Sequence, residues 1–393
     1  RVNQGTFKRN VFAVNPYFTA GETFKLGFTY LHSKDDKTTA QYTRQPQENV
    51  VAGTDLTINL DDNKIQLYAQ GAFSVLNKDI ETGDISNETI DKVFGPNGAF
   101  SGNSEDIKKI KDILSQFITF NQFLSPLKPE ELSSLAYEAS LALNYFGNYF
   151  KGTYLSRGFD YNSFGNNYLR TDVSGFNLFD RVALLDNKMF LSLGYERLED
   201  NRNKTKFATT AFTNFNASIS YYPSFDLPGV ILSYSRNENN NGILSTDPDI
   251  QRRTYGIDDY TNRFGVQVTY RFFAGYNHNL SATGSFASRK DNTVFKFDAN
   301  NTMLGLNYAT EWSKSLQSFL TLNMSNNEII NGSLNTTQTF NITSIVAGAK
   351  YYLMQNKLVL NGSVAPTFGD LKRYAFDASA LYYILQNLSL QLQ

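Results

Sequence analysis

Two histidines, His32 and His278, are the side chains of this chain best suited to acid–base chemistry near neutral pH. A Ser-His-carboxylate arrangement around His32 has only loop residues such as Asp35 or Asp36 to draw on, and we interpret His32 as a plain surface histidine. No Gly-rich phosphate loop, zinc-ligand spacing or cysteine is present. We therefore expect that the protein is not an enzyme and has no metal and no cofactor.

Two loop segments could bind a ligand, and each has a plainer interpretation. The loop 247–259 holds four aspartates whose oxygens suit Ca²⁺, but the EF-hand spacing is absent and two arginines lie between the pairs, which favours a solvated loop. The segment 158–165, GFDYNSFG, could stack on a sugar or an aromatic ligand. An aromatic belt and loop turn at a membrane surface is the favoured interpretation.

The elements that position these residues show a strict alternation of apolar and polar side chains. In 264–272 the residues Phe, Val, Val, Tyr and Phe alternate with Gly, Gln, Thr and Arg, and the segments 189–196 and 388–393 have the same pattern. Period 2 predicts strands with one apolar and one polar face. We expect about eighteen strands. They span 8–19, 23–33, 50–60, 64–76, 137–147, 149–157, 168–183, 188–199, 207–221, 229–237, 261–273, 277–289, 296–311, 316–327, 338–353, 357–366, 373–385 and 387–393.

Composition and connection lengths favour a membrane barrel over a soluble sandwich. Aromatic residues make up 15% of the chain, and no apolar run approaches the roughly 18 residues that a spanning helix needs. A membrane sheet without such helices must close, because an open edge in lipid leaves backbone groups unpaired. We therefore predict an all-β fold, an antiparallel transmembrane β-barrel that forms a single unit over 1–393 in a bacterial outer membrane.

Short and long connections alternate along the chain. The tight turns include 61–63, 186–187, 223–228, 274–275, 355–356 and 386–387, and the long loops include 34–49, 77–136, 158–167, 200–206 and 238–260. The usual asymmetry places tight turns in the periplasm and long loops outside the cell. Both chain ends then lie on the outer side, and Gln393 ends the chain without a terminal aromatic, so we expect a fragment of a longer chain.

The loop 77–136 is too long for a hairpin and predicts a helical insertion. Ser104 can cap a helix over 104–120, and Pro129 can open a second short helix. The apolar stripe of the first helix consists of Ile107, Ile110, Ile113, Leu114 and Phe117. The insertion is either an external cap packed on neighbouring loops or a plug folded into the lumen, and the cap is the favoured alternative.

The polar faces give a second set of candidate residues, which we expect to line a pore. The set comprises Lys25, Asp55, Gln66, Gln70, Asn216, Gln267, Thr269, Arg271, Arg289, Asn307, Glu311, Asn361 and Asp377. It is rich in amides and hydroxyls and contains both signs of charge, which suits water and small polar solutes. The formal net charge of -1 gives no basic field for nucleic acid.

The segments 190–197, FLSLGYER, and 164–172, FGNNYLRTD, resemble bacterial outer-membrane β-barrel proteins, and the second is similar to uncharacterised barrels of the Bacteroidota and Chlorobi groups. The resemblance implies an outer-membrane location and brings no known activity. Our leading prediction is a pore for passive or gated passage of small polar solutes. The alternative is a barrel that anchors a cell-surface protein complex or forms part of a translocon. The expected partners are outer-membrane lipid and, for the alternative, other surface or periplasmic proteins.

Overall fold

The computed structural model describes residues 7–39, 45–94, 104–126, 133–166, 168–224, 226–385 and 388–392. They contain twenty strands and three short helices, so the expected all-β fold is confirmed. The chain divides into two compact units. Unit 1 comprises Arg1–Tyr145, Phe150–Leu178 and Leu198–Thr209, and unit 2 comprises Phe146–Tyr149, Phe179–Arg197 and Thr210–Gln393. No helix in the described part of the chain is long and apolar enough to cross a membrane.

Unit 1 is a sheet of antiparallel neighbours with two helices. β1 and β2 both pair with β3, β3 pairs with β4, β4 with β5, and β5 with β6 and β7. Its elements are β1 (Arg9–Val14), β2 (Tyr17–Ala20), β3 (Phe24–Asp35), β4 (Glu48–Leu60), β5 (Ile65–Asn77), α1 (Asn87–Phe94), α2 (Ser104–Leu114), β6 (Leu124–Ser125) and β7 (Leu135–Tyr145). β8 (Asn148–Arg157), β9 (Val173–Leu184) and β10 (Met189–Glu199) contribute residues to both units.

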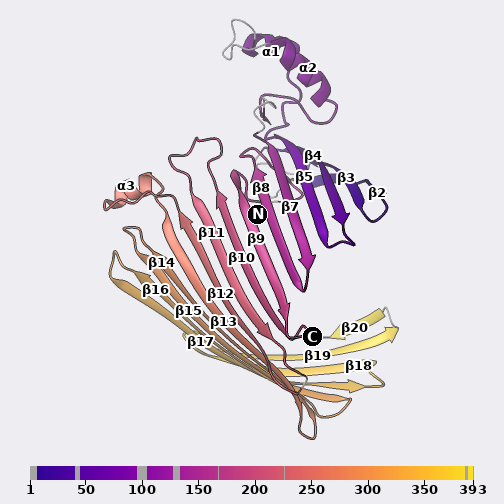
Figure 1. The fold of residues 1–393 in the computed structure, drawn as a ribbon, viewed down its shortest axis with the longest axis vertical. Coiled ribbons are helices and arrows are strands. Elements are labelled where there is room, and N and C mark those ends of the chain that lie inside the picture. The colour runs from indigo at the N-terminus through magenta and orange to yellow at the C-terminus, as the bar shows by residue number, and fades with distance from the viewer. Residues whose placement is uncertain are drawn as a thin grey trace. The chain divides into compact units, whose positions relative to one another are not determined.

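Unit 2 is an antiparallel meander in which each strand from β11 to β20 pairs with the next (Figure 1). Its elements are β11 (Ala211–Tyr221), β12 (Gly229–Asn240), α3 (Pro248–Arg253), β13 (Asp258–Phe273), β14 (Asn277–Asp291), β15 (Phe297–Glu311), β16 (Leu316–Asn331), β17 (Thr336–Leu353), β18 (Leu358–Gly369), β19 (Arg373–Leu385) and β20 (Leu388–Leu392).

The structure corrects the strand count from about eighteen to twenty. The predicted strand 8–19 divides into β1 and β2 at Asn15-Pro16, because proline has no backbone N–H to donate to the ladder. Pro16 still accepts a hydrogen bond from the Phe28 N–H at 2.9 Å. β6 is a two-residue strand inside the insertion and has no alternating pattern that could predict it.

Three tight turns share one backbone geometry. In Asp61–Asp62–Asn63 all three residues have left-handed φ angles of 50°, 52° and 66°, and 185–187 and 354–356 repeat the pattern. In each turn the N–H of the lysine that follows, such as Lys64, donates to the carbonyl three residues earlier. Asparagine tolerates this region better than most side chains and is the last of the three residues in each turn. The predicted turns 186–187 and 355–356 each extend one residue further toward the N-terminus, to Leu185 and Met354.

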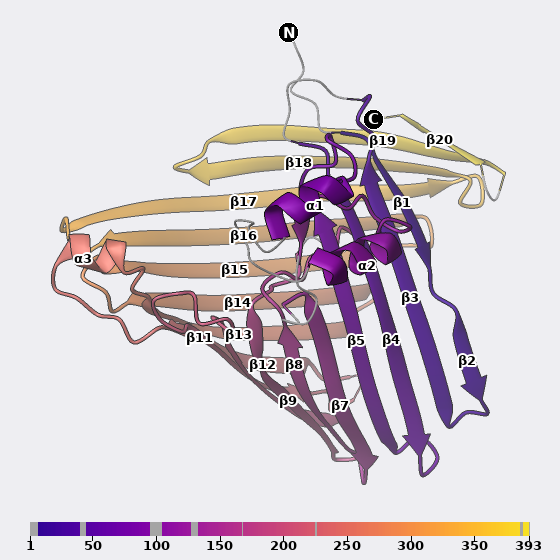
Figure 2. The ribbon, with the colours of Figure 1, turned by 90° about the horizontal axis from the view of Figure 1, so that it is seen from above.

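The predicted helical insertion is confirmed, with different limits. α2 begins at Ser104 as expected but ends at Leu114, after which the chain turns. Further on, the Phe120 N–H donates to the Asp84 carboxylate at 2.6 Å. α1 was not predicted, and the proposed helix at Pro129 lies outside the described residues. The turn 386–387, Phe225 in the turn 223–228, and Gln393 also lie outside them. Figures 1 and 2 show α1 and α2 beyond the ends of β3, β4 and β5.

The hydrophobic core of unit 1 lies where the insertion meets the strand ends. Its buried side chains are Val50, Val75, Ile118, Phe120 and Leu124, and Ile107, Ile110 and Leu114 of α2 pack against them. The core therefore joins β4 and β5 to the insertion.

Candidate functional site

One face of unit 2 is apolar over six consecutive strands. The row Val230, Val268, Ala282, Leu306, Leu322 and Ile345 is continuous, because each residue is the register partner of the next. Neighbouring rows leave large apolar side chains uncovered, with Phe264 at 51%, Phe286 at 52% and Leu304 at 52% exposure. This apolar face has no second layer of protein over it among the described residues of unit 2.

The opposite face of unit 2 is polar and carries the predicted pore-lining residues. The row next to Val268 contains Gln267, Thr283, Gly305, Asn323 and Ser344 as successive register partners. By the same register, the predicted residues Asn216, Gln267, Thr269, Arg271, Arg289, Asn307, Glu311, Asn361 and Asp377 share this face.

Hydrogen bonds tie several of these side chains into cross-strand pairs. The Thr321 hydroxyl donates to the Asn307 side chain, and Asn361 Nδ2 donates to the Ser379 hydroxyl at 3.2 Å. Arg289 reaches the Asp259 carboxylate at 3.3 Å near the long-loop end. The face is thus a polar network with both signs of charge.

A pocket of about 550 Å³ lies on the polar face at the tight-turn end of unit 2. Its polar lining residues include Asp226, Arg271, Asn277, Asn279, Glu311 and Gln317, and we call it the turn-end pocket. The structure here brings together Arg271 and Glu311 from the predicted set, and adds Asp226 from the loop before β12. That loop aspartate has no strand alternation to mark it, so sequence reasoning missed it.

The polar face of unit 1 carries the other four predicted residues. Gln70 Nε2 donates to Glu138 Oε2 at 3.3 Å, and Gln66 Nε2 donates to Asn59 Oδ1 at 3.0 Å. Asp55 is the register partner of both Gly27 and Gln70, and a side chain at Gly27 would collide with the Asp55 carboxyl. Lys25 Nζ lies 4.9 Å from the centre of the Tyr17 ring. Glu138 and Asn59 were not predicted, although they belong to alternating segments.

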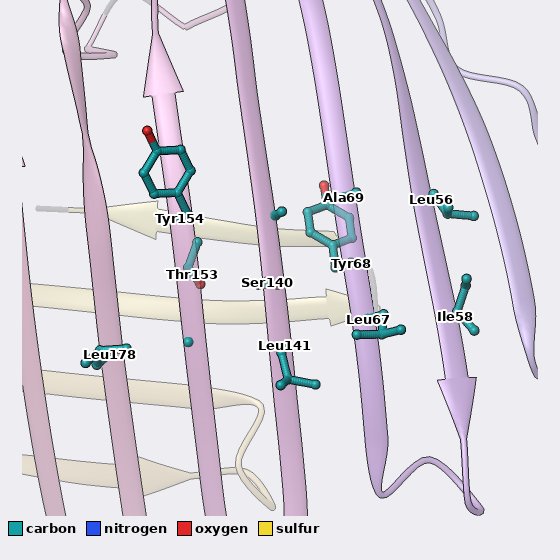
Figure 3. Close-up of a pocket in the computed structure, with 12 residues that line it drawn as sticks. Leu56, Ile58, Leu67, Tyr68, Ala69, Ser140, Leu141, Thr153, Tyr154 and Leu178 are labelled. Atoms are coloured by element: carbon teal, nitrogen blue, oxygen red, sulfur yellow. The ribbon is translucent and has the colours of Figure 1, made fainter.

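The apolar face of unit 1 contains a shallow depression, shown in Figure 3. Its lining includes Leu56, Leu67, Leu141, Tyr154 and Leu178, all labelled there. The small residues Ala69, Ala139 and Gly152 also line it and leave the space between the larger side chains. The depression belongs to the apolar face and offers no chemistry of its own.

His32 is paired with a carboxylate, but not with the one that the sequence suggested. His32 Nε2 lies 2.8 Å from Glu48 Oε1, and Lys34 Nζ lies 3.0 Å from the same oxygen. Asp35 instead pairs with Arg9 at 2.7 Å, and Asp36 accepts from the Thr38 hydroxyl. Glu48 Oε2 accepts the Thr119 N–H at 2.9 Å. The His32–Glu48 pair therefore anchors the insertion and is not placed to activate a nucleophile.

His278 lies in unit 2, on β14 beside the turn at 274–275. Its side of the sheet is the apolar face, where the ring stacks on Phe272 and Tyr308 with centroid distances of 4.9 and 5.7 Å. Nδ1 lies 2.8 Å from the Tyr308 hydroxyl and 3.0 Å from the Thr310 hydroxyl. These contacts make it part of an aromatic cluster near the turns.

The aromatic segment 158–165 is folded onto the strand ends of unit 1. Asn49 is fully buried, donates through Nδ2 to the Val75 and Asn162 carbonyls at 3.0 Å, and accepts the Phe164 N–H at 3.1 Å. The Arg9 guanidinium lies 3.7 Å from the centre of the Phe164 ring. Because the chain is folded onto the strand ends here, β9 starts at Val173 rather than at the predicted residue 168. The segment 158–165 therefore has a structural role.

The acidic loop 247–259 also has a structural role. Asp247 caps α3, because its side chain accepts the N–H groups of Asp249 and Ile250 and Pro248 opens the helix. Gln251 is buried in the loop, where Oε1 accepts the Ser245 N–H at 2.6 Å. Among the residues that the structure describes, no group of three or more His, Asp or Glu is placed to hold a metal ion.

The predicted plug residues separate into two groups. Ile107, Ile110 and Leu114 pack on the core of unit 1, whereas Ile113 is 62% and Phe117 50% exposed. The insertion is thus anchored at the strand ends and presents apolar side chains on its outer side. Its position relative to a lumen stays a prediction.

The loop 200–206 is held by a compact charged group in unit 1. Lys206 Nζ contacts Asp172 at 2.6 Å and Asp200 at 2.9 Å, and Asp172 also accepts the N–H groups of Asn201 and Arg202. Partial burial lowers the pKa of Lys206, but the hydrogen bonds to Asp172 and Asp200 outweigh it and raise the pKa above its usual value.

No protein-family model matches the chain, and no curated protein matches it either. Among solved structures, it is similar to an anion-selective porin from Comamonas acidovorans, with 10% identity, a TM-score of 0.36 and coverage of 94% of this chain and 95% of the porin. It is similar to OmpT, an outer membrane protein of Vibrio cholerae, with 11% identity, a TM-score of 0.36 and coverage of 91% and 89%. The siderophore receptor PirA from Acinetobacter baumannii matches with 10% identity, a TM-score of 0.43 and coverage of 98% and 64%.

Proposed function

We propose that this chain is an outer-membrane β-barrel whose polar face lines a pore for small polar solutes. The observation that carries the proposal is the apolar band on unit 2. On β13 the band covers nine residues, from Phe264 to Phe272, and the eight steps between them span about 27 Å along the strand. The apolar belt of outer-membrane barrels is about 25 Å tall.

Aromatic residues flank this band at both ends. Tyr234, Phe264 and Phe286 lie toward the long loops, and Phe272 and Tyr308 lie toward the tight turns. Aromatic rings gather at both interfaces of a membrane, where one side of the ring is apolar and the other wet. A face of this size in water would be an aggregation surface, whereas in lipid it is covered.

Beyond the band, the strands of unit 2 become polar on both faces. β13 begins with Asp258 and Asp259, and Lys290 of β14 contacts Asp298 of β15 at 2.6 Å. Such ends belong in water, so the strands extend past the membrane on the long-loop side. The polar face opposite the apolar band then contacts water. It presents amides, hydroxyls and charges of both signs to a solute that passes along it.

Single-channel conductance in planar bilayers tests the proposal. We expect stepwise currents in potassium chloride from protein that co-floats with lipid vesicles. Inserted, folded protein that leaves the bilayer sealed would contradict a pore that is open without a further component.

The insertion favours a second candidate function, a platform for a partner at the cell surface. The exposed side chains Ile113 and Phe117 belong to α2 and the turn that follows it, and α2 lies beyond the strand ends. Deletion of residues 80–132 distinguishes the two roles of the insertion. A plug predicts a higher conductance and passage of larger solutes, whereas a platform predicts an unchanged conductance. The similarity to Bacteroidota and Chlorobi barrels stays a prediction.

A further inference from the structure

The turn-end pocket combines one cation and two carboxylates that are not paired with one another. Arg271, Glu311 and Asp226 all line it, and no ion pair joins any two of them within the described residues. Arg271 itself has no ion pair or hydrogen bond to a described side chain. We propose that this pocket binds zwitterionic solutes, namely amino acids with an aliphatic body, with the carboxylate at Arg271 and the ammonium group at Glu311 and Asp226. The proposal rests on the pore function and names the class of solute that this mouth of the pore selects.

The sheet register keeps the opposite charges apart. Arg271 is the partner of Asn279, and Asn279 is the partner of Ala309, so Arg271 and the β15 side chains lie two strands apart, about 10 Å between backbones. Glu311 lies two residues further along β15 than Ala309. The two side chains therefore flank a space instead of neutralising each other. A single solute with one group of each sign fits between them.

The carboxylate of Glu311 is oriented by neutral donors. Asn277 Nδ2 and Gln317 Nε2 donate to its two oxygens at 3.4 Å each. Amide donors hold the group in place without cancelling its charge. An ammonium group of a solute would supply a charge-assisted hydrogen bond that neither amide provides.

The rest of the lining comprises Phe272, Phe273, His278, Ala309 and Thr310, of which Phe273 and Ala309 lie on the polar face and suit an aliphatic body. Phe273 is 75% exposed. The volume of about 550 Å³ lies in the range of small-molecule sites. A solute with only a cation or only an anion would leave one wall of the pocket without a partner.

Ligand-observed NMR of the full chain in detergent micelles tests the proposal. The probes are γ-aminobutyrate, butylamine and butyrate, which share one aliphatic body and carry both charges, the positive charge alone or the negative charge alone. We expect saturable binding of γ-aminobutyrate, with each single-charge probe weaker by about tenfold or more, because each lacks one charge-assisted contact.

Three variants assign the contacts. Arg271→Gln should weaken the binding of γ-aminobutyrate by about tenfold and leave the binding of butylamine unchanged. Glu311→Gln should weaken the binding of both probes. Arg263→Gln is the matched control, because Arg263 lies on the same strand and the same face but outside the pocket. Arg263→Gln should leave the binding of all three probes unchanged.

Equal binding of butylamine and γ-aminobutyrate, with no effect of Arg271→Gln, would overturn the proposal in favour of a cation site. Absence of binding by all three probes would also overturn it. The measurement does not depend on conductance, so a conducting channel without binding refutes the subsite alone. Binding without conductance would leave the subsite standing and refute the pore.

Discussion

Glu48 and Thr119 are 71 residues apart in the sequence, yet the carboxylate of the first accepts the backbone N–H of the second at 2.9 Å. The other Glu48 oxygen is held by His32 and Lys34. Glu48 is only 1% exposed, so it is satisfied entirely by these donors. This contact fastens the insertion to the end of β4.

Glu48→Gln should therefore loosen the insertion while leaving the sheet folded. The loss of charge-assisted hydrogen bonds should lower the free energy of local opening by about 1–3 kcal/mol. Hydrogen exchange at the Thr119 amide and in α2 measures it. Glu81→Gln, at an exposed position in the same insertion, is the control and should have no effect. Unchanged exchange at Thr119 in the Glu48 variant would contradict this role.

Two neighbouring residues of β13 should differ in how strongly an added charge destabilises the barrel. Val268→Arg places a cation in the apolar band and should destabilise the barrel by about 2–4 kcal/mol, whereas Gln267→Arg on the polar face should be mild. Reversible unfolding in lipid vesicles compares the two variants. Equal tolerance at both positions would show that the two faces do not differ in environment.

The orientation of the strands can be measured with single cysteines, because the chain has none of its own. Leu244 lies in the loop that leads to α3 and is 59% exposed, and Lys314 lies exposed in a tight turn. Leu244→Cys should react with a membrane-impermeant thiol reagent on intact cells, and Lys314→Cys only after the membrane is permeabilised. The reverse pattern would mean that the long loops face the periplasm.

The loop 200–206 should lose its order at high pH. The raised pKa of Lys206 means that its stabilising effect is complete below the usual lysine pKa of about 10.4 and is lost as the pH rises through the higher folded value. A spin label at Arg202→Cys should become mobile above about pH 10.4, and Lys206→Met should make it mobile at every pH. A label at Leu244 should not respond to Lys206→Met. A transition at or below the usual pKa would contradict the assignment.

Much of the fold follows from local pattern. Alternation of apolar and polar residues predicts the strands of unit 2 to within a few residues, because the facing of each side chain depends only on its position along the strand. Ser104, Glu105 and Asp106 mark the start of α2 for a similar reason, since acidic residues stabilise the first turn of a helix. Asn63, Asn187 and Asn356 mark tight turns through their own backbone preference.

The rest depends on contacts between segments that are distant in sequence. Nothing local to Asn49 indicates that it is buried and holds the 158–165 segment. Nothing local to Asp84 indicates that its carboxylate accepts the Phe120 N–H and so fixes the path of the chain after α2. The pocket at Arg271 likewise needs the register of four strands, β13 to β16, and a loop before β12. Such juxtapositions follow from the assembled sheet rather than from any one strand.

The most direct test of the central claim is chemical modification of two adjacent cysteines during single-channel recording. A water-soluble, bulky thiol reagent should reduce the conductance of Gln267→Cys, because residue 267 lies on the polar face. It should leave the conductance of Val268→Cys unchanged, because residue 268 lies on the apolar face. Conductance that is insensitive to modification at 267, or sensitive at 268 alone, would contradict a pore lined by the polar face.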